Sequence, residues 1–186
     1  MSYRPFLGLV PLAPVDHLIL PDLRQAIADF LFLPVKILPT RPLPPQTHHP
    51  GRNQYYSTQL LDYLLNDEHG EDPFRILGIT AADLYIPIFT FVFGEAQLDG
   101  KAAIISTFRP GAGAGEVKPS RSLLLSRLIK LSLHELGHTF GLPHCRQDGC
   151  LMGFAANLEK LDQKKTGLCK YCLILLDDYF QSLQDL

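Results

Sequence analysis

Short apolar runs alternate with amphipathic segments from the N-terminus to about residue 108. Apolar runs bounded by proline or polar residues are typical of buried strands. They predict strands at 4–12, 35–38 and 75–81, a strand within 85–93 and a strand at 102–108. Apolar residues at helical spacing predict helices at 16–32 and 57–66, with Ser57 as the N-cap of the latter. Pro87 interrupts the 85–93 run, which indicates an edge strand or a bend.

The pattern changes in the C-terminal part of the chain. Residues 120–140 form the longest helical pattern, and a last helix is expected at 173–183. Two long connections are also evident, a proline-rich loop at 41–53 and a glycine-rich loop at 110–119. The glycine-rich loop lacks the residue order and the glycine spacing of a Walker loop, so we expect a plain connection and no phosphate site.

The composition fits a single domain, residues 1–186. Hydrophobic residues make up 46% of the chain, which is enough for a sizeable core. The formal net charge of −2 offers no basic surface to nucleic acid or an anionic membrane, and we expect neither as a partner. The longest later apolar stretch, 84–93, is far shorter than the ~20 residues of a membrane-spanning helix. Prolines interrupt the apolar N-terminal run, which disfavours a signal peptide. We expect a cytoplasmic monomer.

Residues 134–145, HELGHTFGLPHC, concentrate three histidines, a glutamate and a cysteine. In a helix, His134 and His138 point the same way, so both imidazoles can bind one ion. A continued helix would carry His144 to the far side from that ion. Gly141 can end the helix, and the proline two residues later prevents a restart, so that the chain can reverse and bring His144 back.

Three neutral imidazoles leave one tetrahedral position for water, which is the arrangement of a catalytic zinc. Glu135 is turned by about 100° from His134 along the helix, and is suited to take a proton from that water. We therefore expect Zn²⁺ on His134, His138 and His144, with Glu135 as the general base that later protonates the leaving amine. A core helix that merely contains histidines is the alternative, and the glycine break followed by a third histidine disfavours it.

The four cysteines form two close pairs, Cys145 with Cys150 and Cys169 with Cys172. Paired thiolates from two short loops are typical of a closed structural zinc site, which would hold a second Zn²⁺. Two disulfides or free thiols are the alternatives, and an intracellular location disfavours disulfides. His48 and His49 have no companion at ligand spacing, so we expect them to be surface loop residues.

The stretch HELGHTFGLPH resembles the signature of the metzincin zinc proteases, which also carry a methionine turn beneath the metal. Cys145, Cys150, Met152 and the Cys169-x2-Cys172 pair narrow the resemblance to the archaemetzincins. The segments 53–58 (NQYYST) and 83–106 also look like members of that family. Sixteen residues separate Met152 from Cys169, one fewer than in the family pattern, and a loop can absorb that difference.

The resemblance implies an α/β (α+β) fold with two lobes. Residues 1–141 would form a lobe with a twisted, mixed five-strand sheet, a backing helix and the active-site helix. Residues 142–186 would form a small lobe with the third histidine, the Met152 turn, the four-cysteine zinc site and the last helix. In metzincins an extended peptide or protein substrate pairs with the edge strand above the cleft. The expected substrate-binding strand contains Phe91, Val92, Phe93, Gly94 and Glu95.

The function expected from these features is zinc-dependent hydrolysis of peptide bonds by Glu-assisted attack of a zinc-bound water. One alternative is a zinc-stabilised protein that binds peptides or a partner without turnover, for example if the loop 39–56 covers the cleft. Another is a metal-dependent endoribonuclease, which the glutamate after His134 and the acidic pI of about 6.4 disfavour. A gluzincin-type peptidase with Glu159 as third ligand would leave His144 unexplained.

Overall fold

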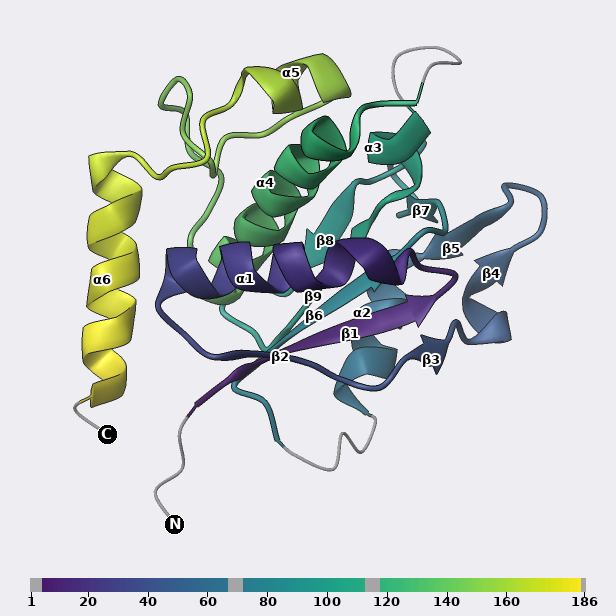
Figure 1. Cartoon of the computed structure of the whole chain (residues 1–186), viewed down its shortest axis with the longest axis horizontal. Coiled ribbons are helices and arrows are strands. Elements are labelled where there is room, and N and C mark those ends of the chain that lie inside the picture. The colour runs from purple at the N-terminus through teal and green to yellow at the C-terminus, as the bar shows by residue number, and fades with distance from the viewer. Residues whose placement is uncertain (1–4, 67–71, 113–117, 185–186) are drawn as a thin grey trace.

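The centre of the computed structural model is a mixed β-sheet with the strand order β2-β1-β6-β9-β8 (Figure 1). The structure describes residues 5–66, 72–112 and 118–184. The strands are β1 (Leu7–Ala13), β2 (Val35–Ile37), β6 (Arg75–Thr80), β8 (Gly94–Ala96) and β9 (Ala102–Ser106). The first four in spatial order are parallel, and β8 is an antiparallel edge strand beside β9. The mixed five-strand sheet is therefore confirmed, and β3 (Arg41–Pro42) extends it by pairing with the end of β1. The first residue of the predicted strand 4–12 lies outside the described residues.

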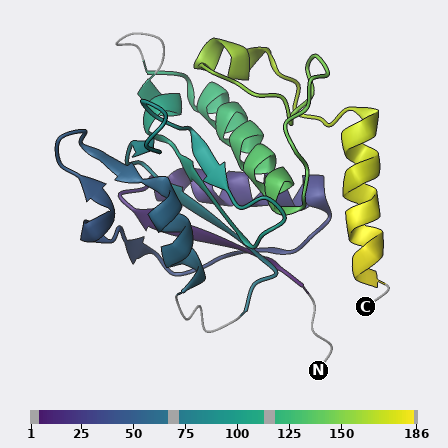
Figure 2. The ribbon, with the colours of Figure 1, turned by 180° about the vertical axis from the view of Figure 1, so that it is seen from behind.

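Helices cover both faces of this sheet. The helices α1 (Leu20–Leu31) and α4 (Arg121–Thr139) lie against one face, and α2 (Ser57–Leu65) lies against the other, as the views from front and back show (Figures 1 and 2). Three further helices are α3 (Phe108–Ala112), α5 (Leu158–Gln163) and α6 (Lys170–Gln184), and short 3₁₀ helices occupy His17–Ile19 and Pro45–Thr47. None of the helices within the described ranges is long and apolar enough to cross a lipid bilayer.

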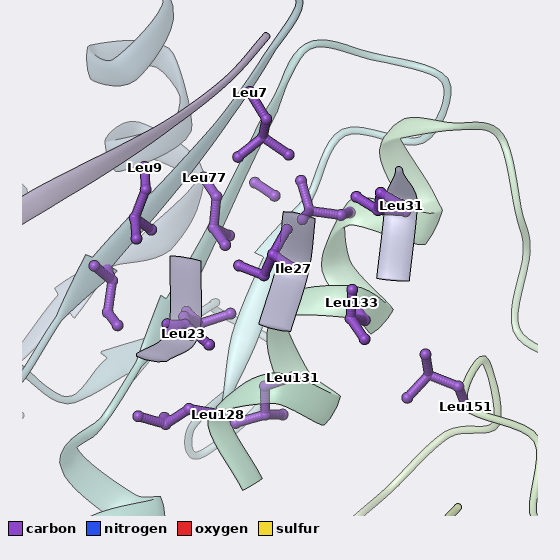
Figure 3. Close-up of a cluster of buried hydrophobic side chains, with 14 of the residues drawn as sticks. Leu7, Leu9, Leu23, Ile27, Leu31, Leu77, Leu128, Leu131, Leu133 and Leu151 are labelled. Carbon is purple, nitrogen blue, oxygen red and sulfur yellow. The ribbon is translucent and has the colours of Figure 1, made fainter. Parts of the chain in front are cut away.

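The strand β1 is apolar along nearly its whole length because both of its faces are covered. Leu7 and Leu9 point into the core between the sheet and helices α1 and α4, whereas Val10 and Leu12 join the core under α2. Figure 3 shows the larger core, in which Leu23 and Ile27 of α1 meet residues of α4 such as Leu128 and Leu131. The long helix α4 is thus fixed on the sheet by its apolar side.

The C-terminal part of the chain packs onto the same core. Leu151, Met152 and Leu161 are buried within it, together with Cys150 and Cys172. The hydrophobic pattern does not predict α5, whose six residues are too short for a helical repeat to be recognised. The division into lobes at residue 141 stays a prediction.

The predicted proline-rich loop at 41–53 contains more order than expected. A second, small sheet consists of β4 (His48–His49), β5 (Gln54–Tyr56) and β7 (Leu84–Tyr85). Arg52 extends from it and donates hydrogen bonds of 2.8 Å to the carbonyl oxygens of Phe89 and Thr90. The small sheet therefore supports the segment that precedes β8. Of the predicted loop at 110–119, residues 113–117 lie outside the described residues.

Two local predictions were wrong. No strand runs through 85–93, because the chain turns after Tyr85, where Pro87 has no N–H to donate, and returns so that Val92 bridges Leu84. Ser57 is not an N-cap but the first residue of α2, and the N-cap is Tyr56. The Ser57 hydroxyl donates instead to the carboxylate of Glu95 on β8.

Candidate active site and cysteine cluster

The helix α4 carries the first two candidate ligands near its C-terminal end. Ser120 caps its N-terminus by accepting a hydrogen bond from the backbone N–H of Leu123 at 3.2 Å. Leu128 and Leu136 hold its buried side in the core. The opposite side of the helix carries His134 and His138, and both side chains line one cavity, as their four-residue spacing predicts.

The chain reverses directly after α4, as expected. Gly141 has a φ of +81°, in the left-handed region, and its N–H donates to the carbonyl oxygen of His138 at 2.9 Å. The N–H of Leu142 donates to the carbonyl oxygen of Gly137 at 3.0 Å, which completes the reversal. This turn brings the His144 ring centre to 4.8 Å from that of His138 and to 5.3 Å from that of His134.

The three imidazoles fit a metal ion. The Nε2 atoms of His134 and His138 lie 3.2 Å apart, close to the roughly 3.3 Å edge of a tetrahedron with zinc–nitrogen bonds of about 2.0 Å. All three histidines offer ring nitrogens within 4.8 Å of one another. The Nδ1 atoms of His134 and His138 donate to the carbonyl oxygens of Leu151 and Leu142 at 2.9 and 2.7 Å, which leaves Nε2 free of a proton for a metal.

The environment also favours neutral rings. Burial lowers the pKa of His134 to about 3. Burial is likewise the main cause of the lowered pKa of His138 and of His144. A metal ligand must be an unprotonated imidazole, so the pocket selects the form that binds zinc.

Glu135 lies buried beside the three histidines. Burial, and secondarily the charge of Glu95, raises the pKa of its carboxyl group to about 8. Its side chain packs directly against Gly94 of β8, where a Cβ would lie 2.8 Å from Cγ and 2.9 Å from Oε1 of Glu135. A raised pKa near neutrality suits a group that has to accept and return a proton.

Glu95 points toward the N-terminus of α2. Its carboxylate accepts hydrogen bonds from the hydroxyl of Ser57 and, at 2.8 Å, from the hydroxyl of Thr58. These bonds tie the edge strand β8 to α2 across the sheet. The position of the strand over Glu135 is therefore fixed from both faces.

A cavity of about 490 Å³ contains the three histidines and Glu135 in its wall. The rest of the wall is mainly aromatic and aliphatic, and includes Phe91, Phe93, Leu131, Phe154 and Leu161. None of the lining residues comes from 39–56, so this loop does not cover the cavity. All five residues of the predicted edge strand line the cavity, but only Gly94 and Glu95 belong to β8.

The four cysteines form a second cluster. Cys145 and Cys169 lie 3.7 Å apart between sulfur atoms, and so do Cys150 and Cys172. A disulfide requires about 2.05 Å, whereas a tetrahedron with zinc–sulfur bonds of about 2.3 Å has edges of about 3.8 Å. All four sulfur atoms lie within 4.8 Å of one another. The arrangement fits a metal ion and excludes the disulfide alternative.

The thiols of this cluster differ in acidity. The backbone N–H of Cys172 is the main cause that lowers the pKa of Cys169 to about 7. Burial is the main cause that raises the pKa of the Cys172 thiol. Because zinc ligands are thiolates, a bound metal would have to displace the proton of Cys172.

Met152 lies directly beneath the histidine-bearing helix. It is fully buried, and its sulfur atom lies where a side chain on Gly137 would begin, 2.5 Å from the position of a Cβ. The carbonyl oxygen of Met152 accepts a hydrogen bond of 2.9 Å from the N–H of Cys145. The turn that contains Met152 therefore contacts both clusters.

Other candidate ligands lie elsewhere. His48 stacks at a tilt on Tyr55, with ring centres 4.9 Å apart, and His49 is exposed. Both lie in the short strand β4 and not in the expected loop. Glu159 is exposed on α5 and belongs to neither group of candidate metal ligands among the described residues. The gluzincin alternative is therefore wrong.

The comparisons with known proteins decide the family. Residues 45–178 match the model of peptidase family M54. The chain belongs to this family. It is 40% identical to an archaemetzincin of Methanopyrus kandleri over 72% of each chain, and 34% identical to an archaemetzincin of Methanocaldococcus jannaschii over 90% of each chain.

A crystal structure of the Methanopyrus kandleri archaemetzincin superposes with a TM-score of 0.83 at 32% identity and covers 96% of both chains. Membership of family M54 makes the protein a zinc metallopeptidase that acts on peptides or proteins. The resemblance to the archaemetzincins, which the histidine and cysteine motifs indicated, is confirmed.

Sequence reasoning missed Gly137 and Lys164, and it named Gly94 only as part of the substrate-binding strand. Gly137 and Gly94 are required by close contacts with Met152 and Glu135, and Lys164 lies in the cavity wall. The two glycines carried a weak signal, since glycine inside a helix or strand often marks a close approach. Lys164 carried none, because lysine is common on surfaces.

Proposed function

We propose that the chain hydrolyses peptide bonds with Glu135 as the general base, at a zinc ion held by His134, His138 and His144. The observation that carries the proposal is the location of a buried carboxyl group beside three neutral imidazoles in one open cavity. A zinc ion bound there would polarise the scissile carbonyl and make a water molecule more acidic.

Glu135 is the group that transfers the proton in this proposal. Its carboxylate accepts a proton from the attacking water and delivers it to the nitrogen of the leaving amine. Burial raises the pKa of Glu135 while no metal is bound, and the positive charge of a bound zinc ion would lower it, so that the carboxylate form would be available to accept the proton. Gly94 supports both steps, because it lets the edge strand and therefore the substrate come close to Glu135.

We further propose that the substrate lies extended along β8, as an added strand at the free edge of the sheet. The lining of the cavity by Gly94, Glu95 and the preceding Phe91–Phe93 supports this path. Four sulfur atoms at tetrahedral separations support a second, structural zinc on Cys145, Cys150, Cys169 and Cys172. A monomer in the cytoplasm remains the expectation for assembly and location.

The test is peptide hydrolysis by the zinc-loaded protein and by Glu135→Gln. The substitution keeps the size of the side chain and removes the base, so we expect at least a hundredfold loss of kcat with unchanged zinc content. Glu159→Gln is the matched control, since Glu159 is exposed and outside the site. Equal activity of Glu135→Gln and the parent protein would refute the mechanism. Peptide binding without hydrolysis by the parent protein would favour the alternative of a binding protein.

A further inference from the structure

Lys164 follows helix α5 and forms part of the cavity wall beside Glu135. Its ammonium group donates to the carbonyl oxygen of Gly153 and, at 3.4 Å, to that of Leu151. An ammonium group has three N–H donors. One donor is therefore left without an acceptor among the described residues.

The positive charge of Lys164 is only partly compensated by its neighbours. Lys164 forms no ion pair with any carboxylate in the described part of the chain, although its side chain is partly buried. The other lysine of the wall, Lys130, donates to the carbonyl oxygens of Leu161 and Asp162 and lies near the Asp162 carboxylate. Burial lowers the pKa of Lys164, and the charges of Cys150 and Glu135 offset this only in part. A further anionic partner would stabilise this partly buried charge.

The apolar part of the cavity wall would strengthen a bond between Lys164 and an anionic group. The wall of the cavity is mainly apolar, with Phe91, Phe93 and Phe154 among its residues. In such surroundings a charge-assisted hydrogen bond is stronger than in water. A carboxylate that enters the cavity would use the free N–H of Lys164 and neutralise its charge.

We propose that Lys164 determines specificity by binding a carboxylate group of the substrate inside this cavity. The carboxylate belongs either to an aspartate or glutamate side chain or to the C-terminus of a peptide. The cavity volume of about 490 Å³ is sufficient for one such residue. The proposal rests on the proposed function, because it assigns the substrate class of the same site.

The test measures binding, so that it does not depend on turnover. Zinc-loaded Glu135→Gln is titrated calorimetrically with peptides that differ only by Glu, Gln or Leu at one position on either side of the scissile bond, with amidated C-termini. A second pair differs only by a free or an amidated C-terminus. We expect roughly tenfold tighter binding of the peptide with the carboxylate. A preference for Glu over Gln and Leu would identify a side-chain carboxylate as the group that is bound. A preference for the free over the amidated C-terminus would identify the C-terminal carboxylate.

Variants at two neighbouring lysines assign the effect. Lys164→Met in the same background should abolish the preference for the carboxylate, and Lys164→Arg should keep most of it. Lys165→Met is the matched control, because Lys165 is the next residue and is exposed. A preference that survives Lys164→Met, or an equal loss of affinity for all peptides, would overturn the proposal.

The peptide comparison also stands alone. If Lys164→Met fails to fold, equal binding of the Glu and Gln peptides and of the free and amidated peptides to zinc-loaded Glu135→Gln overturns the proposal without any lysine variant. Failure of the proposed function is recognised separately, since the parent protein would then bind the peptides with this preference and cleave none of them.

Discussion

The sulfur atom of Met152 fills the space beside Gly137 on the helix that carries His134 and His138. A Cβ on Gly137 would lie 2.5 Å from Sδ and 3.0 Å from Cε of Met152. These contacts leave no room for any side chain at the fourth position of HELGH. The glycine between the two histidines and the methionine fifteen residues later are therefore complementary parts of one contact.

The first prediction follows from this contact. In Gly137→Ala the new methyl group meets a fully buried side chain that cannot move into solvent. We expect a loss of about 1–3 kcal/mol of unfolding free energy, although alanine is the better helix former. Chemical denaturation of the zinc-loaded protein measures it. Gly111→Ala in α3 is the control, since nothing lies within 4 Å of its Cβ position, and it should be neutral or slightly stabilising. Equal effects of the two substitutions would show that the Met152 contact is unimportant.

Gly94→Ala tests the contact between the edge strand and Glu135. The added Cβ would lie 2.7 Å from the carbonyl oxygen of Ile104 and 2.8 Å from Cγ of Glu135. The backbone cannot yield easily, so we expect Glu135 to be displaced and kcat to fall roughly tenfold to a hundredfold. Zinc content should not change. Gly167→Ala, in open space, serves as the control. Full activity of Gly94→Ala would mean that the carboxyl group does not need its present position.

The local part of the site could be predicted from the sequence, and the non-local part could not. The spacing of His134 and His138 and the break at Gly141 are properties of one helix and its end. The position of β8 depends on its pairing with β9, which no local pattern reveals. This strand was therefore predicted within the apolar run 85–93, whereas β8 begins at Gly94. Ser57 and Thr58 donate hydrogen bonds to Glu95, which lies 38 and 37 residues further along the chain. No local sequence pattern predicts contacts over such separations.

The main features of the sheet were predictable for a related reason. Buried parallel strands such as β1 and β6 are continuous apolar runs, which a sequence displays directly. The small sheet of β4, β5 and β7 has strands of two or three residues with polar side chains, and no periodicity can be recognised in so few positions.

The third prediction concerns the stability of protein without metal in the histidine site. In the folded state the pKa of Glu135 is about 8, above its ordinary value of 4.5, so the folded state binds the proton more tightly than the unfolded state. This contribution is fully present below pH 4.5 and is lost as the pH rises toward about 8. The loss is on the order of 4 kcal/mol.

Glu135→Gln isolates this effect because glutamine does not titrate. We expect the free energy of unfolding of Glu135→Gln, relative to the parent protein, to increase between pH 5 and pH 8. Both proteins are treated with a chelator that leaves the four-cysteine site loaded and are unfolded with urea. The histidines act in the opposite direction, since the lowered pKa of His134 destabilises both proteins as the pH falls from 6.5 toward about 3. A constant difference between the two proteins would contradict the burial of an uncharged Glu135.

The last prediction concerns coupling between the two clusters. Cys145 follows His144 directly, and its N–H donates to the carbonyl oxygen of Met152, whose neighbour Leu151 accepts the hydrogen bond from His134. We expect two zinc ions per chain, and one in either Cys169→Ser or His138→Ala. Loss of the ion from the cysteines should loosen these contacts and weaken zinc binding by the histidines about tenfold.

Metal analysis and competition with a chromogenic chelator measure both quantities. Gln147→Ser is the control, because Gln147 lies between two cysteines of the cluster and is exposed. The parent protein and Gln147→Ser should have the same affinity. An unchanged affinity of the histidine site in Cys169→Ser would show that the adjacent clusters act independently, and one zinc in the parent protein would contradict the two-site arrangement itself.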